Sequence, residues 1–104
     1  MTAGPRRGSD PARDLRVARR HLEKGRLEKA AVLLEAVLSR HPESAEAHLA
    51  MGAVLEARGQ RVEAMRRYHE ASAIEPGYAL PLLKFARLAY TSRAIEPSAV
   101  ILGA

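Results

Sequence analysis

The chain has 104 residues, 47 % of them apolar and 4 % aromatic, which suffices for one domain with a core of Leu, Ala, Val and Ile. Such a composition favours closely packed helices over sheets. The net charge is +5, the chain contains no cysteine, which excludes disulfides and thiolate chemistry, and no apolar stretch approaches the length of a membrane span.

The excess of basic residues lies at the N-terminal end. Residues 1–29 hold nine basic and four acidic residues, so the rest of the chain is neutral. Within this part, residues 1–9 contain Gly, Pro and Ser and predict a flexible leader. No apolar run follows the arginines of the leader, which argues against a secretory signal and makes the cytoplasm the expected location.

The first helix is expected over roughly 11–24. Asp10 and Pro11 are typical of a helix start, because an acidic side chain can cap the first turn and proline suits the first helical position. Gly25 can adopt the left-handed conformation that ends the helix. The side chains expected on its buried side are Leu15, Ala18 and Leu22.

A second helix, over roughly 27–40, has the clearest helical period. Pro42 follows it and is expected to end it, because proline disfavours the helical conformation in the residue before it. The apolar residues recur at i, i+3, i+4, i+7, i+10 and i+11, and they are Leu27, Ala30, Ala31, Leu34, Val37 and Leu38.

Three further helices complete the predicted pattern. Ser44 can cap a third helix that ends at Gly59. A fourth helix is expected over roughly 61–74, with a turn at Pro76, and a fifth over 79–93. The side chains of the fourth helix expected to face inward are Val62, Met65, Tyr68, Ala71 and Ile74.

The chain also repeats itself with a period of 34 residues. Residues 11–44 align with residues 45–78, and residues 79–93 correspond to the first half of a third unit. The matched pairs are Gly25 and Gly59, Ala30 and Ala64, Leu34 and Tyr68, and Pro42 and Pro76. Such a period indicates a stacked-repeat protein, in which each unit buries its apolar face against its neighbours.

The last residues, 94–104, form an apolar tail that can fold back over an exposed end of the stack. Residues 94–97 copy residues 73–76 at a spacing of 21. This match either marks a third unit that has lost a turn and part of a helix or is a coincidence over four residues.

With these features, residues 11–93 resemble the tetratricopeptide repeat family, whose units are pairs of antiparallel helices with small residues where the helices cross. The second unit has six residues at the family's spacing, which are Gly52, Gly59, Ala64, Tyr68, Ala71 and Pro76. The resemblance implies an all-α fold over residues 10–93, a helical-hairpin repeat stack or α-solenoid of about five antiparallel helices.

The resemblance further implies a concave groove lined by the first helix of each pair. The residues at those positions are Leu15, Arg16, Arg19, Glu46, Leu49, Ala50, Ala53, Glu56, Leu83, Lys84 and Arg87. Together they predict an apolar floor with cations at both ends, which would suit a peptide or helix with an apolar stripe and acidic ends. The alternative is that the arginines are only solvated charges at the groove edge.

A second surface is predicted on the second helix. Val32, Leu33 and Ala36 extend its apolar stripe, whereas the corresponding residues of the fourth helix are Arg66, Arg67 and Glu70. An apolar patch of this kind often marks an interface, and it suggests self-association into a homo-oligomer or docking on a larger protein. Alternatively, the leader or the tail covers it.

The sequence contains no pattern that predicts catalysis or a cofactor. His21, His41, His48 and His69 lack metal-ligand spacing, and the chain has no glycine-rich phosphate loop and no nucleophile constellation. We therefore predict a non-enzymatic protein-interaction module or adaptor. The alternative is binding of nucleic acid or another acidic surface through residues 1–29, although this region lacks aromatics for base stacking.

Overall fold

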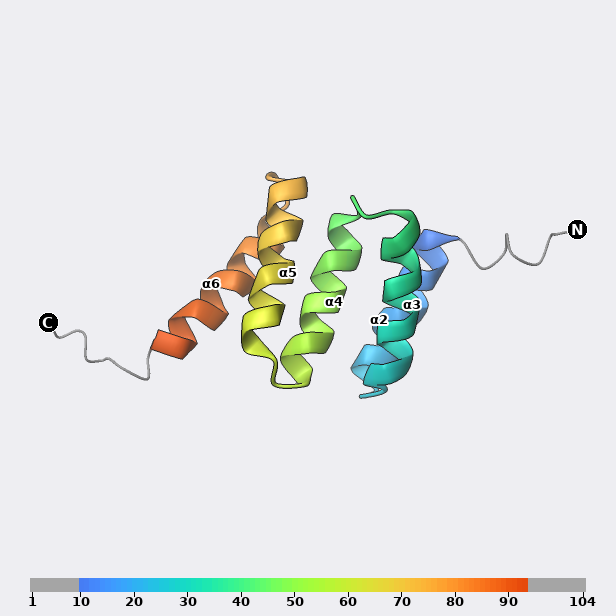
Figure 1. The fold of residues 1–104 in the computed structure, drawn as a ribbon, viewed down its shortest axis with the longest axis horizontal. Helices are drawn as coiled ribbons and strands as arrows, with labels where there is room; N and C mark the ends of the chain where they lie inside the picture. The colour runs from blue at the N-terminus through green and yellow to red at the C-terminus, as the bar shows by residue number, and fades with distance from the viewer. Residues whose placement is uncertain (1–9, 94–104) are drawn as a thin grey trace, which may run out of the picture.

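The computed structural model describes residues 10–93, which form five α-helices stacked one after another (Figure 1). The helices are α2 Pro11–Glu23, α3 Leu27–Arg40, α4 Ala45–Ala57, α5 Arg61–Ile74 and α6 Ala79–Arg93. Their bounds follow the sequence prediction closely, and no strand occurs in the described range. The predicted leader, residues 1–9, and the predicted tail, residues 94–104, lie outside it.

The helices begin and end where the sequence predicts. The Asp10 carboxylate accepts a hydrogen bond from the backbone N–H of Arg13 at 3.4 Å, and Ser44 Oγ accepts one from the N–H of Ala47 at 3.1 Å. The two turns inside the helix pairs contain Gly25 and Gly59, with φ of 77° and 81°. This left-handed conformation favours glycine, so the two matched glycines make the tight turn possible in each unit.

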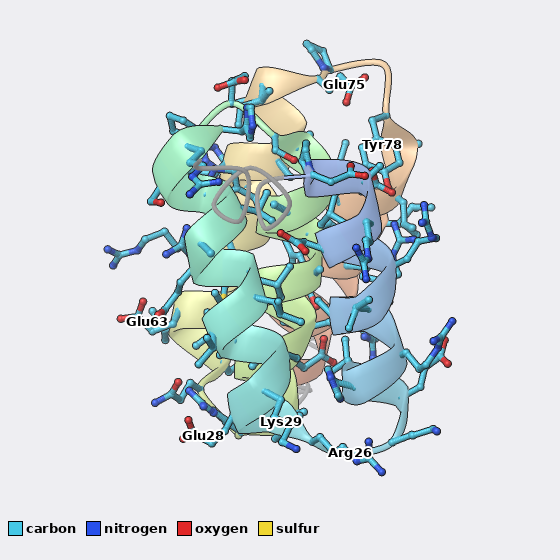
Figure 2. All side chains as sticks on the ribbon, turned by 90° about the vertical axis from the view of Figure 1, so that its right-hand side faces the viewer. Arg26, Glu28, Lys29, Glu63, Glu75 and Tyr78 are labelled. Carbon is cyan, nitrogen blue, oxygen red and sulfur yellow. The ribbon has the colours of Figure 1, made fainter. Side chains whose placement is uncertain are left out.

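The stack has two layers. The first helices of the units, α2, α4 and α6, lie on one side, and the second helices, α3 and α5, on the other (Figures 1 and 2). Each helix contacts the next one along the chain, and α2 also contacts α4 directly. The second helices pack behind this first-helix layer.

Alanine supplies eight of the sixteen buried apolar residues among those described, which allows the helix axes to approach closely. One cluster joins α2, α3 and α4 and consists of Leu15, Ala18, Ala30, Ala31, Leu34, Val37, Ala47, Ala50, Met51 and Val54. A second joins α4, α5 and α6 and consists of Leu49, Ala64, Tyr68 and Leu88. The apolar stripe predicted for α3 is buried at Ala30, Ala31, Leu34 and Val37.

The buried face of α5 is narrower than the sequence predicts. Tyr68 and Ala71 are buried and Met65 is half-buried, but Val62 and Ile74 are exposed. Val62 is two residues from the buried Ala64 and therefore lies on nearly the opposite side of the helix. Ile74 is the last residue of α5 and lies at the wall of a surface cleft.

Candidate protein-interaction surface

Half of the apolar floor that the sequence predicts for the groove, which consists of Leu49, Ala50, Ala53 and Leu83, is buried. Leu15, Leu49 and Ala50 are less than 9 % exposed and belong to the two core clusters. The structure corrects the groove prediction for Leu49 and Ala50, because the face of α4 on which they lie packs against neighbouring helices. Leu15 is buried, as the helical pattern of its own helix predicts. Ala53 stays half-buried, and Leu83 is 63 % exposed.

The charged residues of the predicted groove pair with one another between successive first helices. Arg19 of α2 forms an ion pair with Glu46 of α4. Arg87 of α6 donates to Glu56 of α4 at 2.8 Å between Nη2 and Oε2. Both carboxylates therefore come from α4, separated by about 15 Å along its axis. One ion pair bridges each junction in the first-helix layer.

Glu56 is also held from the core side. The hydroxyl of Tyr68, a fully buried residue of α5, donates to Glu56 Oε1 at 2.8 Å. Burial and this hydrogen bond to Glu56 raise the pKa of Tyr68 above its usual range. The Glu56 carboxylate thus contacts both Tyr68 of α5 and Arg87 of α6, and it links the second-helix layer to α6.

The sequence prediction assigns Tyr68 to the core and misses its polar contact. A signal for it exists in the alignment of the two units. Where unit one has Leu34 and Leu22, unit two has Tyr68 and Glu56. Both substitutions replace an apolar side chain of unit one with a polar one in unit two, and the two polar side chains contact each other in the structure. Such a pair of substitutions indicates a hydrogen bond that unit one does not have.

Two predicted groove cations have no such partner in the described range. Arg16 is exposed and Lys84 is half-buried. Within residues 10–93 neither side chain forms a hydrogen bond or an ion pair with another residue.

Tyr78, in the turn before α6, lies near the Arg19–Glu46 pair. Partial burial raises its pKa, the charge of Glu46 raises it further, and the charge of Arg19 acts in the opposite direction. Figure 2 shows Tyr78 on the α2 side of the stack. Residues of α2, α4 and the turn before α6 therefore come together at one place.

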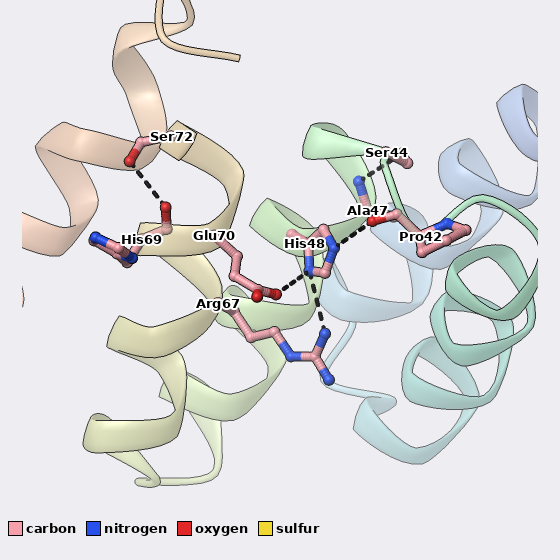
Figure 3. Close-up of polar contacts among 8 residues, drawn as sticks. All are labelled: Pro42, Ser44, Ala47, His48, Arg67, His69, Glu70 and Ser72. Atoms are coloured by element: carbon pink, nitrogen blue, oxygen red, sulfur yellow. Dashed lines mark hydrogen bonds and ion pairs between the residues drawn. The ribbon is translucent and has the colours of Figure 1, made fainter. Parts of the chain in front are cut away.

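A separate polar cluster lies around His48, between the α3–α4 turn and α5 (Figure 3). The buried His48 ring has Nε2 at 2.9 Å from the carbonyl oxygen of Pro42, so Nε2 carries the proton and donates. Its Nδ1 lies 3.1 Å from Nη1 of Arg67 and accepts from it, with Oε1 of Glu70 at 3.6 Å. These contacts link α5, through His48 of α4, to the α3–α4 turn.

The cluster borders an open cleft of about 530 Å³. The residues lining the cleft are Pro42, Glu43, His48, His69, Glu70, Ala73 and Ile74. No group of three or more potential metal ligands occurs in the part of the chain that the structure describes.

The second predicted interface lies on the other side of the stack, on α3. Val32 is 62 % exposed, Ala36 is exposed and Leu33 is half-buried. Val32 and Leu33 line a shallow cavity of about 340 Å³, together with Glu28, Lys29 and His21.

The His21 ring has an unusual environment. Its Nδ1 is buried and has no hydrogen-bond partner among residues 10–93. Burial lowers its pKa below the usual value, and the charges of Arg26, Lys29, Lys24 and Arg20 lower it further.

Lowering the pH from 7 to 5 should therefore lower the melting temperature, and His21→Leu should weaken this dependence. The unfolded chain titrates at about 6.5 and the folded chain at a lower pH, so the unfolded chain binds more protons in between. The stability linked to His21 is complete above pH 6.5 or so and is lost as the pH falls through the folded-state pKa.

Circular dichroism melts at both pH values measure the effect. Leucine at position 21 copies Leu55, its equivalent in unit two. His41→Leu, which leaves His21 in place, serves as the control and should retain the dependence. An unchanged pH dependence in His21→Leu would contradict the assignment.

The two-layer stack of antiparallel helix pairs defines this chain as a helical-repeat protein. A family model for the tetratricopeptide repeat matches residues 21–76, more than half of the chain, and the chain belongs to this family. Domains of the family generally mediate protein–protein interaction. Comparison with curated proteins gave no match. Among residues 10–93 no helix is both long and apolar enough to cross a membrane.

Proposed function

We propose that this chain is a non-enzymatic adaptor that binds an acidic peptide or helix of a partner protein across the layer formed by α2, α4 and α6. The observation that supports the proposal is the placing of cations along this layer. Arg19 and Arg87 lie on either side of α4, each beside one of its carboxylates. Arg16 and Lys84 add two charges that have no partner within residues 10–93.

The ion pairs orient the arginines without preventing their use. Both pairs are substantially exposed, with side-chain exposures of 43 % and 47 % for Arg19 and Glu46 and of 56 % and 27 % for Arg87 and Glu56. Exposed pairs contribute only about 0–1 kcal/mol. A partner carboxylate can therefore replace Glu46 beside Arg19 at small cost, while the rest of the fold stays intact.

Since Leu15, Leu49 and Ala50 are buried, α2 and α4 contribute little apolar area to the surface. Ala53 lies at the position equivalent to Arg19 and Arg87, one period from each. A small residue there leaves room for a partner backbone between the two arginines. We therefore expect the acidic groups of the partner to determine recognition more than its apolar side chains.

The proposal is tested by capturing partners from a lysate of the source cells, with and without nuclease, and then measuring the affinity of the purified partner. We expect a partner protein that is still captured after nuclease treatment and that binds the Arg19→Glu variant at least ten-fold more weakly than the wild type. The reason is that the substitution places a negative charge opposite the acidic groups of the partner. Arg13→Glu makes the same charge change elsewhere on α2 and should bind as the wild type does.

A charge swap separates binding from folding. The double variant Arg19→Glu with Glu46→Arg can re-form the ion pair between α2 and α4, so its melting temperature should match that of the wild type while binding stays weak. Equal affinity for the wild type and Arg19→Glu would contradict the proposed surface. A captured set that disappears with nuclease would instead favour nucleic-acid binding through residues 1–29.

A further inference from the structure

The last described helix, α6, has two apolar faces. One packs into the stack through the buried Pro81 and Leu88 and the half-buried Phe85. The other is exposed, although its residues recur at i, i+3, i+4, i+7 and i+11 like those of a packed face. It consists of Ala79, Leu82, Leu83, Ala86 and Tyr90, with Leu82 58 %, Leu83 63 % and Tyr90 78 % exposed.

The equivalent face is buried or half-buried in both preceding units. Ala86 corresponds to Ala18 of unit one and to Gly52 of unit two. Ala18 is fully buried in the cluster that contains Leu34 of α3. Gly52 is buried beneath the ring of Tyr68 of α5. In each unit, the second helix covers this position of the first helix. The face of α6 is exposed because no second helix covers it within residues 10–93.

Residues 95–104 match α3 at a spacing of 68, which is two periods of the repeat. The segment IEPSAVILGA aligns without gaps with LEKAAVLLEA, residues 27–36. Five of the ten residues are identical, and in two more isoleucine replaces leucine. This match is longer than the four-residue copy at a spacing of 21, and it keeps the period that relates the first two units. It also places the segment at the position of the missing second helix.

We propose that residues 95–104 form the second helix of a third unit and dock on the exposed face of α6. In this register Leu102 corresponds to Leu34 and Tyr68, so its side chain covers Ala86. Val100 corresponds to Val32, which is 62 % exposed, and points to solvent. The occupant is thus a segment of the same chain, and the inference does not depend on the proposed function.

Two departures from the repeat make this unit weaker than the others. Arg93 stands where Gly25 and Gly59 adopt positive φ, a conformation that costs a residue with a side chain more than it costs glycine. In the structure α6 continues to Arg93, two residues beyond the positions at which α2 and α4 end, so docking requires these last two residues to leave the helix and form the turn. Pro97 would be the third residue of the new helix, where the first turn tolerates proline because its N–H has no intrahelical partner.

The test compares Leu102→Asp with Val100→Asp in the full chain. Both add one negative charge to the same segment, but only Leu102 should face α6. Hydrogen exchange followed by mass spectrometry should show the backbone amides of residues 99–104 protected at least ten-fold in the wild type and in Val100→Asp, and unprotected in Leu102→Asp. The melting temperature should fall by roughly 5 °C in Leu102→Asp alone.

Three results would overturn the proposal. The first is an absence of protection at residues 99–104 in the wild type. The second is an equal response of protection and melting temperature to the two substitutions. The third is a dimer, measured by light scattering, that Leu83→Asp dissociates and Leu102→Asp leaves intact. This third result would mean that a second copy of the chain, rather than residues 95–104, covers α6.

Discussion

Gly52→Ala is expected to lower the melting temperature by roughly 10 °C, for a cost of about 1–3 kcal/mol. A Cβ atom at this position would lie 2.4 Å from Cε1 and 2.7 Å from Cδ1 of Tyr68. The Tyr68 ring is fully buried and its hydroxyl is tied to Glu56, so the ring cannot withdraw from the new methyl group. A single methyl group must therefore displace α5 from α4.

The chain supplies both a control and a compensating change. Gly77→Ala adds the same methyl group where nothing lies within 4 Å, and its melting temperature should stay close to that of the wild type. Unit one combines Ala18 with Leu34 at the positions of Gly52 and Tyr68. Adding Tyr68→Leu to Gly52→Ala recreates that pair in unit two.

In a double-mutant cycle, this double variant should be more stable than the sum of the single effects predicts, by about 1 kcal/mol or more. Strictly additive effects would mean that the contact between Gly52 and Tyr68 does not limit the packing of unit two. Denaturant unfolding of the four proteins measures the coupling.

The repeat explains why so much of the fold could be predicted from the sequence. Each helix boundary depends on a local signal, such as the side-chain caps Asp10 and Ser44 or the turn glycines Gly25 and Gly59. These signals act over a few residues and occur twice in register. Tertiary packing did not have to be known to find them.

The arrangement of the surface could not be predicted in the same way. The family resemblance indicates which helix lines a groove, but the rotation of that helix decides which of its side chains are exposed. For this reason Leu49 and Ala50 are predicted at the surface but lie in the core. The pair Arg19–Glu46 joins residues of different units, and its partners follow only from the way α2 and α4 pack.

Glu56→Leu is expected to cost about 1–3 kcal/mol, because it leaves the buried hydroxyl of Tyr68 without an acceptor. For a chain of this size, this corresponds to a fall in melting temperature of roughly 5–15 °C. Leucine is the residue that unit one has at this position, Leu22, and is therefore compatible with the helix pair. The expected loss comes from Tyr68, since the partner of Leu22 in unit one is not a tyrosine.

Two comparisons isolate this cause. Glu46→Leu removes the other carboxylate of α4, whose partner Arg19 is exposed, and should change stability by less than about 1 kcal/mol. In a Tyr68→Phe background, Glu56→Leu should cost much less than in the wild type, because no hydroxyl is left unpaired. Equal costs in both backgrounds would assign the role of Glu56 to its pair with Arg87 instead. In that case the ion pair, and not the hydrogen bond from the core, would position the carboxylate on the first-helix layer.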